Sequence, residues 1–356
     1  MKKDLYTPKE RWEIVLSGGL PDRIPMDYWG TPEISRKIMQ HFQTEDRYEL
    51  AGKLHIDLPY SVYATYIGPE PPPDHDIFGI RYRTVDYGDG TYREACHAPL
   101  SEYTSMDEIK ANYRWPSADW WDVSTVHEQV EQHPDQPLVV GGSEPMLLYK
   151  NLRGEAQAMM DLALNPEIAQ YCLDKLFDLA YQQTLRLYEA LPQGTKPTYT
   201  YVAEDLGGQK NLMYSPTHIK EFLFPGMKRM IDLAHQIGAK VFHHDDGNIS
   251  KILPDLIDLG IDILNPIQWR ADGMDRQWLK DTYGDQLVFH GAVDNQHTLP
   301  FGTSEDVRNE VIENIAILGR NGGYILAPCH NIQPNTPIDN IITLYETGYE
   351  AGWYRK

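Results

Sequence analysis

Two β-rich runs in the second half of the chain end in residues that could bind a metal ion. One run ends in His243 and His244, with Asp246 two residues further on, and a later run ends in Cys329. Residues two apart on an extended strand point the same way, so His244 and Asp246 share a face and His243 points to the opposite side. A histidine nitrogen, a carboxylate and a thiolate together suit Zn²⁺, and three protein ligands leave one position open for a substrate.

The neighbouring β-rich runs also end in polar side chains. These are Glu204, Asp205, Asn265, Gln268, His290, Asp294 and His330. We expect Asn265, Gln268 and Asp294 to contact the substrate and the other four to act in catalysis. Glu204 is also a fourth candidate ligand, or a group that hydrogen-bonds a ligand from behind. Two alternatives stay open: the carboxylates could act as acid and base without a metal, and Cys329 alone is also typical of a small buried residue.

Eight β-rich runs alternate with stretches of helical periodicity. They cover residues 24–29, 55–62, 137–142, 198–204, 239–244, 261–266, 286–291 and 324–329. This alternation predicts a parallel sheet, and eight units predict a (β/α)₈ barrel in which the carboxyl ends of the strands meet on one face. No Gly-x-Gly-x-x-Gly follows the first run, which argues against a doubly wound sheet. Helix starts are predicted at Asn165-Pro166, Ser215-Pro216, Thr303 with Asp306, and Thr336-Pro337.

Residues 67–135 depart from this repeat. They contain a proline cluster and then a pattern typical of a hairpin around Gly88-Asp89-Gly90. We interpret the segment as an insertion after the second strand of a single-domain barrel, in the place where such loops shape a substrate pocket. Its three tryptophans fit either an aromatic lid or contacts with the core or a second copy of the chain.

The composition is that of a globular protein with an acidic surface. Of 356 residues, 41% are apolar and 24% are charged, and the formal net charge is −20. This charge repels phosphate backbones and anionic lipid heads, so we expect neither nucleic acid nor a membrane surface as a partner. Three cysteines make no disulfide framework, the N-terminus lacks an apolar signal core, and no run approaches the ~18 apolar residues of a membrane helix. These features predict a cytoplasmic protein.

Motifs along nearly the whole chain resemble those of the uroporphyrinogen decarboxylase superfamily. They are Pro21-Asp-Arg-Ile-Pro25, Glu204-Asp-Leu-Gly-Gly-Gln209, His244-Asp-Asp-Gly247, His290-Gly-Ala-Val-Asp294 and Gly323-Tyr-Ile-Leu-Ala-Pro-Cys329-His330. The resemblance implies a (β/α)₈ barrel, in agreement with the count of β-rich runs.

One branch of this superfamily consists of true decarboxylases, which grip a tetrapyrrole's carboxylates with an arginine-rich segment after the first strand. The corresponding residues 26–33 contain no arginine here but include an aspartate. In a chain of net charge −20, this argues against a polyanionic substrate. Tyr28 and Trp29 of this segment are candidate substrate contacts. Asp57 lies near the position in the sequence at which the decarboxylases have their catalytic aspartate, so the resemblance implies a catalytic role for Asp57.

Members of the other branch resemble methyltransferases that exchange methyl groups with a separate corrinoid protein. Those methyltransferases bind zinc through a His-x-Cys motif and a further cysteine near the end of the chain. His244 and Cys329 match that pattern, but Asp246 stands in place of the middle cysteine. An oxygen ligand leaves the metal more Lewis acidic, which favours polarising an oxygen leaving group over activating a thiol. The leading hypothesis is therefore a zinc-dependent methyltransferase acting on a small methylated substrate, such as an aryl methyl ether, with a corrinoid protein as partner.

Two further hypotheses compete with methyl transfer. The first is a metal-free decarboxylase or lyase acting on a small acid, with Asp57 and His290 or His330 handling protons. The second is a barrel without catalysis that serves as a binding subunit. The sequence is compatible with a homodimer in each case.

Overall fold

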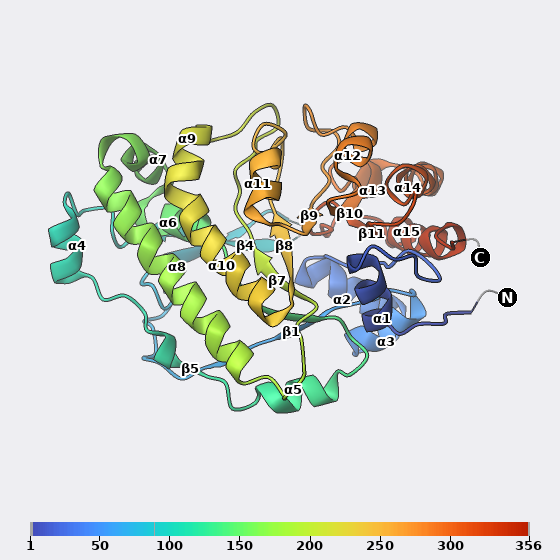
Figure 1. Ribbon diagram of the computed structural model, residues 1–356, viewed down its shortest axis with the longest axis horizontal. Coiled ribbons are helices and arrows are strands. Elements are labelled where there is room, and N and C mark those ends of the chain that lie inside the picture. Colours follow the sequence, from blue (N-terminus) through green and yellow to red (C-terminus); the bar gives the residue numbers. More distant parts are fainter. Residues whose placement is uncertain (1–2, 89, 355–356) are drawn as a thin grey trace.

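A curled, parallel sheet of seven strands forms the centre of the computed structural model, which describes residues 3–88 and 90–354 (Figure 1). Its strand order is β1-β6-β7-β8-β9-β10-β11, so successive strands of the sheet lie side by side. The strands are β1 Tyr60–Val62, β6 Leu138–Ser143, β7 Tyr199–Val202, β8 Lys240–His244, β9 Ile263–Asn265, β10 Val288–Val293 and β11 Tyr324–Pro328. Almost every residue of these strands is buried or half-buried, as expected for a parallel sheet covered on both faces.

The predicted first strand is not a regular strand in the structure. Residues 24–29 make only a parallel bridge between Met26 and Leu326 of β11, where Asp27 N also donates to Leu326 O at 2.9 Å. On the other side, Asp57 N donates to Met26 O at 2.7 Å, just before β1 begins. Pro25 has no N–H to donate, which limits any regular ladder here. The segment thus lies between the two edges of the seven-stranded sheet.

Helices cover the outer side of the sheet (Figure 1). Those after β6 are α6 Pro145–Arg153, α7 Glu155–Leu164, α8 Pro166–Glu189, α9 Pro216–His218, the π-helix Ile219–Leu223, α10 Phe224–Ile237, α11 Leu253–Leu259, α12 Arg276–Tyr283, α13 Thr298–Phe301, α14 Ser304–Leu318 and α15 Ile338–Ala351. Before the sheet come α1 Pro8–Leu16, α2 Pro32–His41 and α3 Arg47–Lys53. Helix α8 packs on β6 and α10, and α14 packs on β10 and α15.

The helix starts predicted from the sequence are confirmed. Helix α8 begins directly after Asn165, and the side chain of Ser215 accepts the N–H of His218 at the start of α9. Thr303 and Asp306 form a capping box at α14, and α15 begins after Pro337. The Ser215 and Thr303 side chains accept backbone N–H groups that have no partner within the helix, whereas Asn165 and Pro337 make no such side-chain bond.

Small elements fill the segment between β1 and β6. They are β2 Thr65–Tyr66, β3 Arg81–Asp86, β4 Thr91–His97, α4 Met106–Asn112, the 3₁₀ helix Ala118–Trp120, β5 Trp121–Asp122 and α5 Val126–Gln132. The predicted hairpin is confirmed, because β3 and β4 pair as antiparallel strands; Asp89 of its turn lies outside the described residues. The antiparallel pair β2–β5 places Trp121 opposite Tyr66.

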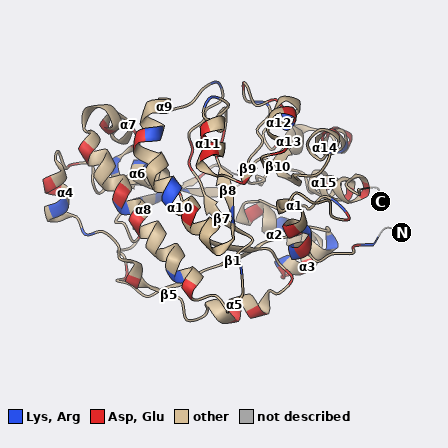
Figure 2. Cartoon of the chain, viewed as in Figure 1, with Lys and Arg blue, Asp and Glu red and all other residues tan. Residues whose placement is uncertain are grey.

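Charged side chains lie mostly on the outer helices. Figure 2 shows acidic residues spread over helices on several sides of the molecule, including α8, α11, α3 and α5. Within the described part of the chain, no helix is both long enough and apolar enough to cross a membrane.

A buried ionic network ties the N-terminal segment to the edge of the sheet. Arg11 donates to both Asp22 and Asp57, and Arg23 donates to Asp57 at 2.7 Å. Asp57 also accepts the backbone N–H of Met26 at 2.9 Å. Two guanidinium groups therefore neutralise Asp57, which has 1% of its surface exposed. The structure thus places Asp57, for which the sequence resemblance implied a catalytic role, inside a buried ionic network.

The carboxylate of Asp22 gives this network a dependence on pH. Burial alone would raise the pKa of Asp22, but hydrogen bonds from Arg11 and from the Leu5 amide lower it to about 2. The folded-state pKa thus lies below the unfolded value of 3.8, so the stabilisation is present above pH ~4 and is lost as the pH falls towards 2.

We expect Asp22→Asn to lower the free energy of unfolding by about 2–3 kcal/mol at pH 7, and by progressively less between pH 4 and 2. Urea unfolding at several pH values measures this difference. Asp178→Asn is the matched control, because Asp178 forms an exposed ion pair with Arg229 that should contribute less than ~1 kcal/mol. A loss at Asp22 that does not change with pH would show that its charge is not the cause.

Candidate metal and substrate site

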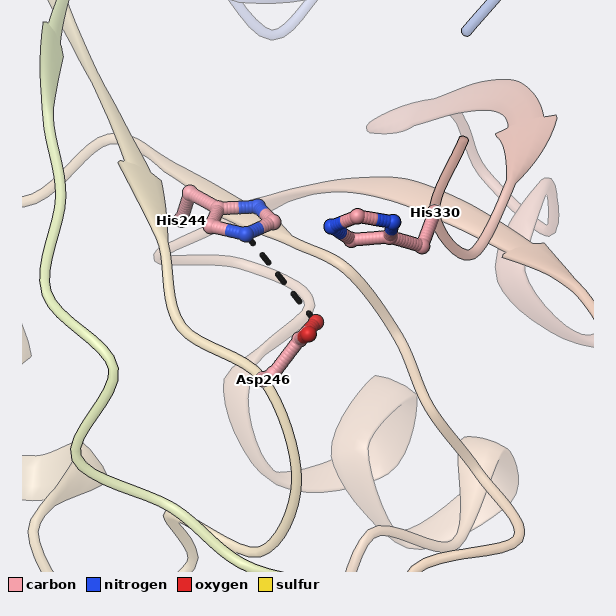
Figure 3. A group of neighbouring side chains, drawn as sticks. All are labelled: His244, Asp246 and His330. Carbon is pink, nitrogen blue, oxygen red and sulfur yellow. Dashed lines mark ion pairs between the residues drawn. The ribbon is translucent and has the colours of Figure 1, made fainter. Parts of the chain in front are cut away.

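His244, Asp246 and His330 come together at the carboxyl end of the sheet (Figure 3). His244 is the last residue of β8, Asp246 lies in the loop that follows, and His330 comes just after β11. Their ligand atoms all lie within 4.8 Å of one another, and His244 Nε2 is 4.0 Å from Asp246 Oδ1. In Figure 3 the two imidazole rings lie next to each other, with the carboxylate pointing towards them. The predicted shared face of His244 and Asp246 is thus present.

Cys329 is not part of this group. Its thiol points to the carbonyl of Ile267, at 3.3 Å, and burial raises the pKa of Cys329 well above its ordinary value. The next residue, His330, reaches the group instead. Both residues lie in a bend after β11, and there His330 faces His244, with ring centroids 5.7 Å apart. His330, which the sequence predicted as catalytic, takes the place for which Cys329 was predicted.

Gln268 fixes the orientation of Asp246. Its Nε2 donates to Asp246 Oδ1 at 2.7 Å, and its Oε1 accepts the Gly247 N–H at 2.8 Å. The structure therefore places Gln268, a predicted substrate contact, behind a ligand atom. Burial raises the pKa of Asp246, and the nearby His244 and His330 oppose that rise.

The imidazole of His330 favours its neutral form. Burial lowers the pKa of His330, while the charge of Asp246 acts in the opposite direction. A neutral imidazole has a nitrogen lone pair for a metal ion, whereas an imidazolium does not. The arrangement thus offers two imidazole nitrogens and one carboxylate oxygen.

Glu204 and Asp205 lie near this group but outside it. Glu204 is completely buried; its Oε2 accepts the Met146 N–H at 3.0 Å, while its Oε1 has no hydrogen-bond partner among the described residues. Burial, together with the charges of Glu144, Asp245 and Asp205, raises the pKa of Glu204 well above its ordinary value. Asp205 also has one buried oxygen without a partner in the described chain. This concentration of acids favours protons or a cation nearby.

The other predicted site residues have clear hydrogen-bond partners. Asn265 and His290 form a buried row behind His244. Asp294 binds Arg270, and its backbone N–H donates to Glu310 at 2.6 Å, so it organises the loop after β10. No contact of Asp294 with His244, Asp246 or His330 is part of this network, and its role towards a substrate stays a prediction.

An aromatic cavity of about 560 Å³ lies behind Trp29 and Tyr201, which separate it from His244; none of His244, Asp246 and His330 lines it. Its lining includes both predicted contacts, Tyr28 and Trp29, together with Trp121 and Tyr201. Trp29 and Tyr201 also pack against the ring of His244, with centroid distances of 5.6 and 6.0 Å. The volume fits a small organic molecule, and the aromatic walls favour an apolar or aromatic one.

The sequence interpretation missed three residues of this site, Asp27, Tyr199 and Tyr201. Asp27 lines the cavity with 1% of its surface exposed and binds His290. Tyr201 lies two residues after Tyr199 on β7, and both line the cavity. The spacing of the two tyrosines is a signal that could have identified that face of β7. Asp27 could be recognised only once its partner on β10 was known.

Comparisons with known proteins agree on the family. The curated relatives include uroporphyrinogen decarboxylases from Prochlorococcus marinus (strain MIT 9303), 30% identical over 188 residues, and from Carboxydothermus hydrogenoformans, 27% identical over 136 residues. These matches cover 48% and 38% of this chain and 49% and 37% of the relatives, so the chain spans about half or less of their length.

A solved structure shares the whole fold. A methyltransferase from Methanosarcina mazei matches with a TM-score of 0.65 and 19% identity, over 97% of this chain and 99% of that one.

The sequence profile of uroporphyrinogen decarboxylase (URO-D) matches residues 123–350. The chain therefore belongs to the uroporphyrinogen decarboxylase family.

Proposed function

We propose that this protein is a zinc-dependent methyltransferase that moves a methyl group between a small methylated substrate, such as an aryl methyl ether, and a corrinoid carried by a partner protein. The observation that carries the proposal is the convergence of His244, Asp246 and His330, with Trp29 and Tyr201 of the aromatic cavity packed against His244. The methyltransferase of the same fold supports the class of reaction, although at 19% identity it shows the fold alone.

The three side chains suit zinc in both number and chemistry. Catalytic zinc sites commonly use three protein ligands, including two histidines with one carboxylate, and keep a fourth position open. His244 and His330 would supply nitrogen and Asp246 would supply oxygen, while the unpartnered acids nearby would favour a cation. Bound there, zinc would act as a Lewis acid towards the oxygen from which the methyl group departs.

Residues of the protein orient the substrate in this proposal. Trp29 and Tyr201 line the cavity and pack on His244, so an aromatic ring held between cavity walls would have its ether oxygen near the ligand group. Gln268 holds Asp246 in place through its amide nitrogen. Such positioning contributes to the rate because it holds the reacting groups in place before the reaction begins.

We further propose that residues 24–29 close the sheet into an eight-stranded barrel. Their hydrogen bonds to Leu326 on one side and to Asp57 on the other support this closure. The cavity would then lie in the mouth of the barrel, over which the elements between β1 and β6 pack as an insertion. Trp121 of that segment lines the cavity, which supports a role as part of its wall.

Decarboxylation of a small acid is the second candidate, because the curated relatives are uroporphyrinogen decarboxylases. Two observations weigh against it. Asp57 is buried, is bound by Arg11 and Arg23, and does not belong to the lining of the aromatic cavity. The segment of residues 26–33 offers no arginine for a substrate carboxylate.

Metal binding by individual variants tests the ligand set. We expect His244→Ala and His330→Ala to weaken zinc binding at least about 10-fold, because each removes a nitrogen ligand. Cys329→Ser should bind zinc like the wild type and is the matched control. Competition with a chromophoric chelator gives the affinities, and thermal unfolding verifies that each variant is folded. Loss of zinc in Cys329→Ser with retention in His330→Ala would reject the proposed set.

The reaction class is tested with simple substrates. With 4-methoxyphenol and reduced cobalamin standing in for the partner's corrinoid, the zinc-loaded protein should form methylcobalamin, detected by its absorbance, and the zinc-free protein should not. Carbon dioxide release from small aromatic acids, independent of zinc and cobalamin, would favour the decarboxylase instead.

A further inference from the structure

A row of buried polar side chains leads from the cavity to His244 across three neighbouring strands. Asp27 Oδ2 lies 3.0 Å from His290 Nε2, His290 Nδ1 lies 2.7 Å from Asn265 Nδ2, and Asn265 Oδ1 lies 2.6 Å from His244 Nδ1. At most 5% of the surface of each residue is exposed. His244 pairs with Asn265 in the register of β8 and β9, and His290 follows Phe289, which pairs with the residue before Asn265.

The direction of these hydrogen bonds is set at Asp27. Its carboxylate also accepts the backbone N–H of Tyr28 at 2.8 Å and the indole N–H of Trp29 at 2.9 Å. A carboxylate oxygen that accepts these bonds also accepts from His290, which places a proton on Nε2. The amino group of Asn265 can only donate, so the Nδ1 atom of His290 that faces it is an acceptor.

The remaining steps follow from the amide of Asn265. Its Nδ2 must donate to His290 Nδ1, which leaves its Oδ1 facing His244 as an acceptor. His244 therefore carries its proton on Nδ1. Its Nε2, the atom on the side of Asp246, is left with a free lone pair. The reverse order of donors would place the proton on Nε2 and block metal binding there.

We propose that Asp27, His290 and Asn265 are positioning residues that fix the tautomer of His244 so that its Nε2 is free to bind a metal ion. The proposal deepens the metal site proposed above and rests on it for its function. The tautomer itself is a property of the metal-free protein, so it can be measured whether or not the protein transfers methyl groups. Partners of this kind around metal-binding histidines raise metal affinity by about 10- to 100-fold.

The first test is nuclear magnetic resonance of metal-free protein labelled with ¹⁵N in its histidines. Long-range ¹H–¹⁵N spectra distinguish the two neutral tautomers, and His244→Gln identifies the His244 signals. We expect Nδ1–H for His244 and Nε2–H for His290. The opposite tautomer at His244 would overturn the proposal, even for a protein that binds zinc.

The second test exchanges the carboxylate of Asp27 with the amide of Asn265. In Asp27→Asn the new amide can donate as well as accept, so it no longer forces the proton onto Nε2 of His290, and zinc affinity should fall about 10- to 100-fold. Adding Asn265→Asp should restore the affinity, because a carboxylate at 265 can only accept and again requires Nδ1–H on His244. A purely structural role for Asp27 predicts no such rescue.

Two further variants keep the test decisive. Asp161→Asn is the matched control, because Asp161 is completely buried and bound to Arg153. The same isosteric change there should lower stability without changing the row of hydrogen bonds from Asp27 to His244. We therefore expect Asp161→Asn to bind zinc with the affinity of the wild type. If Asp27→Asn does not fold, Asn265→Asp and Asn265→Leu replace it. The aspartate should retain zinc affinity and the leucine should lose it; equal affinities in this pair, or a double variant no tighter than Asp27→Asn, would overturn the proposal.

Discussion

The parallel order of β8, β9, β10 and β11 is the constraint on which the site depends. Because these strands run the same way and lie side by side, their carboxyl ends place residues far apart in sequence at one edge of the sheet. His244 and His330 are thereby brought together, although 85 residues lie between them in the sequence. The same register aligns His244 with Asn265, so the hydrogen bond behind the ring comes from the ladder itself.

The local sequence was enough to predict most of the sheet and two of the three members of the ligand group. Seven of the predicted strands are present, because each strand follows a short run of apolar residues. The predicted helix starts are present because they depend on local signals, such as Ser-Pro or Asn-Pro. His244 and Asp246 were predictable because a spacing of two fixes their shared face.

Other features depend on contacts that no local pattern reveals. The sequence could not decide between Cys329 and His330, because both lie in a bend after β11, where strand alternation no longer fixes which side chain faces the site. The ionic environment of Asp57 was not predictable, because its partners, Arg11 and Arg23, are distant in sequence and reach it only in the fold. Residues 24–29 read as a strand, but they make isolated bridges where Pro25 interrupts the pattern of donors.

Electrostatics connects the acidic composition to the proposed chemistry. Burial raises the pKa of Glu144, Glu204 and Asp246 around the ligand group, so keeping these acids charged costs free energy. A divalent ion would offset this cost. In the proposed function, the acids therefore favour a metal ion, and the row of hydrogen bonds from Asp27 orients one of its ligands.

The nature of the ligand atoms is the central claim, and X-ray absorption spectroscopy of the zinc-loaded wild-type protein tests it most directly. The account predicts a zinc environment of nitrogen and oxygen only, at about 2.0–2.2 Å, with the outer-shell scattering of two imidazoles. A sulfur ligand at about 2.3 Å would contradict it, because none of the three proposed ligands contains sulfur.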